Sequence, residues 1–176
     1  TREVDPQSFS SLGALFDEPF WLFYNKAAFA GAPVEYLAQL KGKQVAVGLP
    51  GSGSQALALQ LLADNGITAE NTTLFELPRQ VETEQLIGGD IDAVLLLDAY
   101  QSESVQSLLR APDVGLANLA QAEAYAARQH ALKVVDLPEG VIDLGANIPA
   151  NDVRMLSSAA NLVIRNDLNP TLARSL

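Results

Sequence analysis

The sequence predicts an α/β fold with a doubly wound, mainly parallel sheet. Three observations support this prediction: strand-like and helix-like segments alternate from residue 41 onward, the strand-like segments are short and apolar, and glycines follow helix-like segments where C-caps are expected. The run Ala93 to Leu97 is apolar throughout, which is typical of a strand covered on both faces. The 176 residues, 48% of them hydrophobic, provide enough apolar side chains for one domain or one lobe.

Each element is predicted from its own pattern. Phe20 to Tyr24 is aromatic and apolar on both faces, which indicates a buried or paired strand. Apolar residues at helical spacing from Ser54 to Asn65, followed by Gly66, indicate a helix. The remaining expectations are a short helix at 34–40; strands at 43–48, 72–77, 91–97, 114–117, 132–137 and 160–165; helices at 78–87, 103–110 and 119–129; a turn-rich segment at 138–153; and a terminal helix opened by Asn169, Pro170 and Thr171.

Composition excludes several classes of function. The net charge of −10 argues against binding to nucleic acid or to an anionic membrane surface. The chain has no cysteine, which excludes disulfides and thiolate metal sites, and its one histidine, His130, makes a histidine metal site hard to build. No apolar run approaches the roughly 18 residues of a spanning helix. The chain begins at Thr1, and we expect it to be a segment of a longer protein.

A glycine-rich turn from Gly48 to Ala56 lies between a predicted strand and a predicted helix. The start of a helix leaves backbone N–H groups unpaired and carries partial positive charge. Glycines allow an anion to approach these groups, and Ser52 and Ser54 add hydroxyl donors. The turn is therefore a candidate site for a carboxylate or a phosphate.

Other interpretations of this turn compete. A Walker A loop would need a lysine where Ser54 stands, so nucleotide hydrolysis is disfavoured. Gly51, Gly53 and Ala56 fit a dinucleotide fingerprint, with Glu76 at the end of the next strand as the ribose-binding acid. In the simplest alternative, the serines only cap the helix.

Further candidates follow from the strand ends, because ligands of open α/β sheets gather at the carboxyl ends of the strands. Glu76, Asp98 and Tyr100 lie at such ends, and Ala99 lies between the last two. Asp98 could instead cap the helix that starts near Ser102, and Tyr100 could pack on the sheet edge. Arg79 could pair with a ligand carboxylate, although pairing with a neighbouring glutamate or exposure to solvent is the simpler expectation.

Asp90 and Asp92 form a pair of carboxylates with the spacing that places two side chains on one face of a strand. They follow Gly88 and Gly89, however, and so lie at the entrance of the strand rather than at its carboxyl end. We expect them to be turn residues without a role in acid–base chemistry.

Two segments carry a resemblance to a known family. The run Leu40 to Ser54 and the run Ile87 to Val94 resemble signature segments of TAXI-type solute receptors of TRAP transporters, and residues 12–21 and 161–165 also look like family segments. The resemblance implies one lobe of a type 2 periplasmic-binding-protein fold plus partial segments of the other lobe. Residues 1–40 would belong to the first lobe and crossover, 41–145 to the second lobe, and 146–176 to the return crossover and first lobe.

The resemblance also implies a function. Such a receptor captures a small carboxylate-bearing metabolite, an organic acid or amino acid, in a cleft between lobes, without catalysis or a cofactor, and passes it to TRAP membrane subunits. It would be periplasmic, with a membrane anchor in the full-length protein as an alternative. Combined with the strand-end argument, the expected ligand-binding residues are Pro50, Gly51, Ser52, Gly53, Ser54, Glu76, Asp98, Ala99 and Tyr100.

Two functions from other classes stay open. The first is a dinucleotide-binding lobe of an NAD(P)-dependent oxidoreductase, which would use Gly51, Gly53 and Glu76; the sequence offers no evident catalytic group for it. The second is an interaction domain whose cleft no longer binds a ligand. We also expect Phe20 to Tyr24 to be a sticky strand in a chain that lacks the other lobe, which would favour a homodimer.

Overall fold

The computed structural model describes residues 9–165 of the chain. The chain divides into two compact units, residues 1–17 with 159–176 and residues 18–158. The described residues of the first unit belong to the outer parts of two long strands, β1 (Phe9–Asn25) and β7 (Val153–Arg165). The helix expected at Asn169 lies outside the described residues. No helix within residues 9–165 is both long and apolar enough to cross a membrane.

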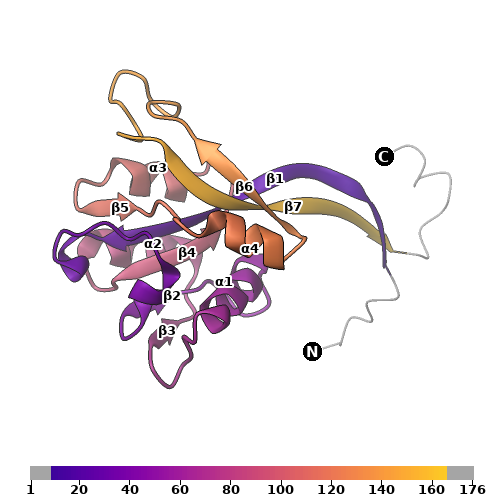
Figure 1. The fold of residues 1–176 in the computed structure, drawn as a ribbon, viewed down its shortest axis with the longest axis horizontal. Helices are drawn as coiled ribbons and strands as arrows, with labels where there is room; N and C mark the ends of the chain where they lie inside the picture. Colours follow the sequence, from indigo (N-terminus) through magenta and orange to yellow (C-terminus); the bar gives the residue numbers. More distant parts are fainter. Residues whose placement is uncertain (1–8, 166–176) are drawn as a thin grey trace. The chain divides into compact units, whose positions relative to one another are not determined.

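Three parallel strands form the centre of the second unit. β2 (Gln44–Ala46) pairs with β3 (Thr73–Phe75) on one side and with β4 (Ala93–Leu97) on the other. The crossovers run through α1 (Gly53–Asp64) and α2 (Arg79–Gly88). Because all three strands run the same way, their carboxyl ends meet at one edge of the sheet, as Figure 1 lets the reader follow.

Antiparallel pairings extend the sheet beyond these strands. β1 runs antiparallel to β4, with Phe20 opposite Leu97 and Tyr24 opposite Ala93, and gives the order β3-β2-β4-β1-β7-β6. β5 (Val114–Leu116) pairs with β1, and β6 (Leu132–Leu137) pairs with β7. The other elements are α3 (Glu103–Arg110), α4 (Ala122–Arg128) and two 3-10 helices, η2 (Ala27–Phe29) and η3 (Leu37–Leu40). The predicted α/β class is confirmed.

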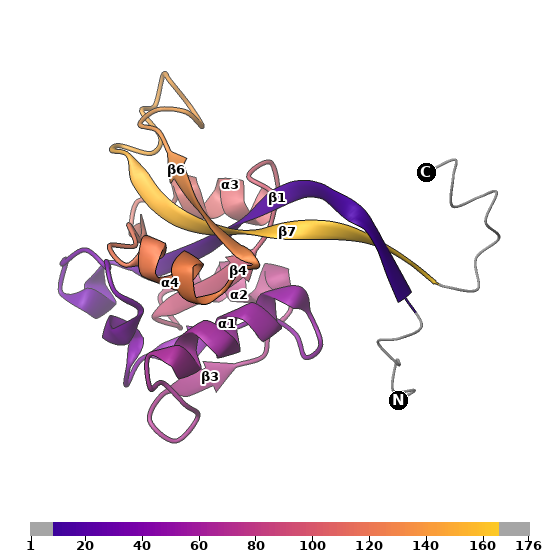
Figure 2. The same cartoon turned by 45° about the vertical axis from the view of Figure 1, so that its right-hand side comes forward.

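Helices cover both faces of the sheet, because alternate side chains of each strand point to opposite sides. Phe20 and Leu22 of β1 pack in one cluster with side chains of α1, η3 and α4. Trp21 and Phe23 pack in the other cluster with Leu86 of α2 and with side chains of α3. In Figure 2, α1 and α4 lie in front of the strands, and α2 and α3 lie behind them. The doubly wound arrangement follows from these two apolar layers.

The strand Phe20 to Tyr24 is buried and paired, as its apolar pattern predicts. It lies inside the sheet, and none of its five side chains is more than 7% exposed. The expectation of a sticky, uncovered strand is wrong because β4 and β5 occupy its hydrogen-bonding edges and helices cover its faces. The two helix ends behave as predicted: Gly66 and Gly89 adopt left-handed conformations after α1 and α2.

Candidate ligand-binding site

The glycine-rich turn joins β2 to α1 at the carboxyl edge of the parallel strands. Gly48 and Gly51 have φ values of +87° and +79°, which favour glycine and allow the sharp turn. Ser52 is the N-cap of α1, and its hydroxyl accepts a hydrogen bond from the Gln55 backbone N–H at 3.1 Å. The capping alternative therefore applies to Ser52, and a ligand contact by its hydroxyl stays a prediction.

Two backbone N–H groups at the start of α1 are available to a ligand. The N–H groups of Gly53 and Ser54 form no hydrogen bond with any part of the chain that the structure describes. They lie in the first turn of a 12-residue helix, where the partial positive charge is concentrated. This geometry suits an oxyanion at the carboxyl edge.

The Ser54 hydroxyl links α1 to β4. It accepts a hydrogen bond from the Leu97 N–H at 2.9 Å and lies 3.3 Å from the Leu97 carbonyl oxygen, to which it can donate. Ser54 is buried, so this contact is shielded from solvent. Its side chain thus has a structural partner, and a ligand contact by its unbonded backbone N–H stays a prediction.

Gln55 and Glu76 connect the turn to the end of β3. The Gln55 side chain donates from Nε2 to Glu76 Oε1 at 2.7 Å and accepts from the Gly51 N–H at 3.0 Å. Gln55 is buried, whereas Glu76 is exposed. Glu76 therefore lies beside the turn as predicted, with its carboxylate already bonded to an amide; a ligand contact by Glu76 stays a prediction.

Arg79, in the first turn of α2, lies where all three strand ends meet. Its Nη2 lies 3.2 Å from Ser54 Oγ and 3.3 Å from the Leu97 carbonyl oxygen, and donates to both. Its Nη1 donates to Glu82 Oε1 at 3.2 Å, and its Nε lies 3.7 Å from Asp98 Oδ2. The expected pairing with a neighbouring glutamate is confirmed, but Arg79 also joins α1, α2 and the end of β4.

Glu82 is a buried carboxylate behind this arginine. Its side chain is only 1% exposed, and its Oε2 has no hydrogen-bond partner within the described residues. Burial raises the pKa of Glu82 to about 7, Arg79 lowers it in part, and the charge of Asp98 raises it further. Glu82 therefore changes its charge near neutral pH, directly beside Arg79.

Asp98 and Tyr100 follow β4 at the same edge. The Asp98 side chain accepts a hydrogen bond from the Ala99 N–H at 2.9 Å. The backbone carbonyl oxygen of Asp98 accepts one from Trp21 Nε1, also at 2.9 Å. The alternative that Asp98 caps α3 is wrong, because Ser102 is the N-cap and accepts from the Val105 N–H. Tyr100 is 47% exposed. Ligand contacts by these residues and by Pro50 stay predictions.

The sequence did not single out Gln55, Glu82 or Trp21 as site residues. Glu82 had a detectable signal, since it lies four residues before Leu86 and so shares the buried face of α2. Trp21 joins the site only through the antiparallel register of β1 and β4, which no local pattern reveals. Asp92 lies at the opposite, amino edge, where it accepts from the Gln44 N–H at 2.8 Å, in agreement with its prediction as a turn residue.

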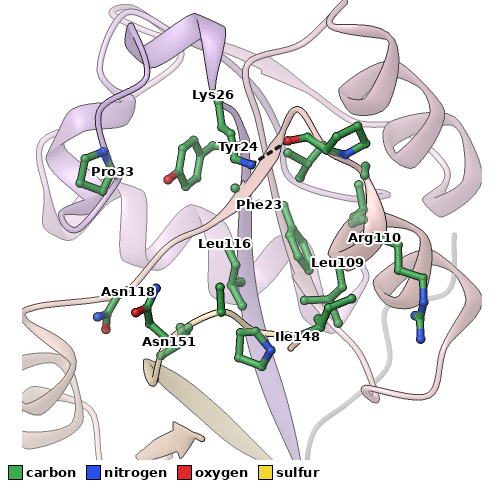
Figure 3. Close-up of a pocket in the computed structure, with 18 of the residues that line it drawn as sticks. Phe23, Tyr24, Lys26, Pro33, Leu109, Arg110, Leu116, Asn118, Ile148 and Asn151 are labelled. Atoms are coloured by element: carbon green, nitrogen blue, oxygen red, sulfur yellow. Dashed lines mark hydrogen bonds between the residues drawn. The ribbon is translucent and has the colours of Figure 1, made fainter. Parts of the chain in front are cut away.

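A hollow lies apart from the candidate site, beside the end of β1. It measures about 830 Å³ and is lined by the ends of β1, β5 and α3 and by the segment 146–153 (Figure 3). Its two cations are engaged: Lys26 donates to the Pro112 carbonyl oxygen at 2.7 Å, and Arg110 pairs with Asp143 at 3.6 Å. Within residues 9–165, no group of three or more His, Asp or Glu side chains is placed to hold a metal ion.

The comparison with family models decides the classification. A model described as the NMT1-like family matches residues 3–176, almost the whole chain. The chain belongs to the NMT1-like family. A search among curated proteins found no significant match to this NMT1-like chain.

Solved structures similar to the NMT1-like chain include ligand-bound proteins. An ancestral arginine-binding protein bound to arginine is 15% identical, with a TM-score of 0.56 over 96% of this chain and 55% of that one. The amino acid ABC transporter substrate-binding protein AbpA from Streptococcus pneumoniae, bound to L-arginine, is 17% identical, with a TM-score of 0.50 over 92% and 49%. The chain thus spans about half the length of these proteins.

A regulatory domain has a similar fold. The CcmR regulatory domain of Synechocystis PCC6803, in complex with 2-PG, is 11% identical to this NMT1-like chain, with a TM-score of 0.53 over 99% of this chain and 67% of that one. At these identities, the likeness shows the fold: the chain has the architecture of a periplasmic-binding-protein lobe.

Proposed function

We propose that this chain is the ligand-binding lobe of a solute receptor and captures a small carboxylate-bearing metabolite at the carboxyl edge of β2, β3 and β4. The observation that carries the proposal is the pair of unbonded N–H groups of Gly53 and Ser54 at that edge, in the first turn of α1. We propose reversible binding without catalysis, as the resemblance to solute receptors implies.

The likeness to substrate-binding proteins supports a receptor. AbpA and the ancestral arginine-binding protein each hold an amino acid, which carries a carboxylate. In a two-lobed receptor, the other lobe would close over the ligand and bury it. Closure would stabilise the liganded form relative to the open form, which is the signal that a membrane partner can recognise.

A thermal-shift screen with paired variants tests the proposal. The ligands are L-glutamate, L-arginine, glutarate and NAD. Gly53→Pro removes one N–H at the first helical position, where proline is tolerated, and Ser52 already has the extended conformation that precedes proline. Gly53→Ala keeps the N–H, and its added Cβ meets only Leu97 Cδ2 at 4.0 Å.

The expected result is stabilisation of the wild type and of Gly53→Ala by at least one carboxylate. Gly53→Pro should bind that ligand about tenfold more weakly, the effect of losing one hydrogen bond to a charged group. Equal binding by Gly53→Pro and Gly53→Ala would exclude the helix start as the anion site. Stabilisation by NAD alone would favour the dinucleotide-binding lobe instead.

The finer assignment to a TRAP system rests on the runs Leu40 to Ser54 and Ile87 to Val94, which resemble TAXI-type receptors. We propose TRAP membrane subunits as the partner and the periplasm as the location. Ligand-dependent capture by purified TRAP membrane subunits supports this assignment, and capture by ABC permease subunits alone contradicts it. The homodimer also stays a proposal, but the strand Phe20 to Tyr24 no longer supports it, because this strand is buried. Sedimentation at increasing protein concentration tests it.

A second candidate function is the ligand-sensing part of a regulator. The likeness to the CcmR regulatory domain, which covers 67% of that chain, favours it. The carboxyl-edge site would be the same, but the partner would be the remainder of a regulatory protein rather than a membrane protein. Ligand binding without capture by either class of membrane subunit would favour this candidate.

A further inference from the structure

We propose that Arg79 selects ligands by their charge. In this proposal, its guanidinium binds an acidic group of the ligand in place of Asp98. The inference rests on the proposed function, because it adds a side chain to the same carboxyl-edge site. It assigns Arg79 the role of a specificity-determining residue and Asp98 the role of an internal anion that the ligand displaces.

Three contacts fix one side of the guanidinium. Nη2 donates to Ser54 Oγ and to the Leu97 carbonyl oxygen, and Nη1 donates to Glu82 Oε1, all at 3.2–3.3 Å. Ser54 and Glu82 are buried, so water does not compete for these two hydrogen bonds. An arginine anchored in this way loses little conformational entropy when it binds a further acceptor.

The other side of the guanidinium has donor capacity left. An arginine carries five N–H donors, and none of the three contacts uses the Nε–H group. The carboxylate oxygen paired with Nε is Asp98 Oδ2. The two atoms lie 3.7 Å apart, which is longer than a hydrogen bond. The Arg79 side chain is 32% exposed and the Asp98 side chain 27% exposed, so a ligand can reach the position between them.

Asp98 shows which chemistry belongs at that position. Oδ1 of its carboxylate accepts a hydrogen bond from the Ala99 N–H at 2.9 Å. Oδ2 forms only the long ion pair with Arg79. A ligand carboxylate that bonded Nε–H directly would replace a contact of 3.7 Å by a charge-assisted hydrogen bond, which is shorter and stronger. The unbonded N–H of Ser54 belongs to the residue whose hydroxyl accepts from Arg79 Nη2, so a ligand bound at the start of α1 through one carboxylate can offer a second acidic group to Arg79.

The test uses two probes that differ by one negative charge, glutarate and its monoamide. The ¹⁵N-labelled 176-residue chain is titrated with each probe, and the Arg79 Nε–H signal is assigned by its loss in Arg79→Lys. Glutarate should shift this signal more than the monoamide does. Arg79→Gln should weaken glutarate binding about tenfold and bring the two probes to equal affinity.

Asp98→Asn gives an effect of opposite sign. Removal of the competing carboxylate should strengthen glutarate binding about threefold or more, with little change for the monoamide. The matched control is Arg110→Gln, because Arg110 forms an ion pair of similar length with Asp143 but lines the hollow beside the end of β1. This control should leave both affinities unchanged. Amide spectra of every variant show that the fold is kept, and Arg79→Lys and Asp98→Asn provide the answer should Arg79→Gln not fold.

Three results would overturn the inference: an Arg79 Nε–H signal that does not move with glutarate, an unchanged ratio of the two affinities in the Arg79 variants, or weaker glutarate binding by Asp98→Asn. Shifts of the Gly53 and Ser54 amide signals without a shift at Arg79 would leave the proposed function standing and reject this inference. No shift at any of these three groups would reject both.

Discussion

Glu82 shows how a single residue couples the site to pH. Its ordinary pKa of 4.5 is raised to about 7, mainly because burial disfavours the charged form. Between these two values, the folded protein keeps a proton that the unfolded chain releases. The free energy of unfolding therefore falls as the pH rises from about 4.5 through 7, and this loss is complete above 7.

Glu82→Gln should remove this pH dependence. Glutamine retains an oxygen that accepts from Arg79 but has no carboxyl proton to lose. From pH 5 to pH 8.5, the difference in free energy of unfolding should change by about 3 kcal/mol in favour of Glu82→Gln, since one pKa unit corresponds to about 1.4 kcal/mol. Urea unfolding at several pH values measures it. A difference that stays constant with pH would show that Glu82 titrates normally.

The pairing of β1 with β5 depends on a residue without a side chain. Gly115 of β5 lies opposite Tyr24 of β1, and the Tyr24 ring covers it. A Cβ at position 115 would lie within 2.6 Å of Tyr24 Oη and would overlap the ring. Tyr24 is buried and packs edge-on against Phe29, so its ring has little room to move away.

Gly115→Ala should therefore destabilise the fold by roughly 1–3 kcal/mol, the usual cost of overpacking a well-packed core. Gly145→Ala is the matched control, because its Cβ would meet only Asp143 Oδ1 at an ordinary 3.5 Å. The control should change stability by about 0.5 kcal/mol or less. Equal chemical-denaturation midpoints for the two variants would show that the Tyr24 ring moves aside at no cost.

The helices and strands differ in how well the sequence predicts them. β4 was predictable because five apolar residues in a row need cover on both faces, and α1 because a serine cap and Gly66 mark its two ends. The full lengths of β1 and β7 were not predictable, since residues 9–17 and 153–159 have no apolar run as clear as Phe20 to Tyr24.

The candidate site divides in the same way. Glu76 and Asp98 could be placed from the rule that parallel strands end at one edge. The contacts of Arg79 with Ser54 and Leu97 could not, because these residues lie 25 and 18 positions away in the sequence, and such partners depend on how helices pack across the sheet. Local periodicity determines which face of a helix is buried but does not determine which carboxylate a long side chain reaches.

At the scale of the whole molecule, the two described apolar clusters lie in one unit. Every buried side chain in the two described apolar clusters lies between Phe20 and Leu156. This range falls within the unit formed by residues 18–158.

We therefore expect a chain of residues 18–158 to fold without the outer segments. It should unfold cooperatively and give a well-dispersed amide spectrum, because it retains both described apolar clusters. Differential scanning calorimetry of the short and the 176-residue chains compares them directly. A broad, non-cooperative transition in the short chain would show that the outer segments are needed for folding.

The contact between Trp21 and Asp98 has an optical consequence. Trp21 is the sole tryptophan of the chain, and it is fully buried. Its indole N–H donates to the backbone carbonyl oxygen of Asp98, at the carboxyl edge of the parallel strands. Its emission therefore reports on one known place in the molecule, with no second indole to obscure it. If a ligand displaces Asp98 from Arg79, the peptide group bonded to this indole should be disturbed as well. A change in Trp21 emission on ligand addition would then report an occupied site, without a dye or a label.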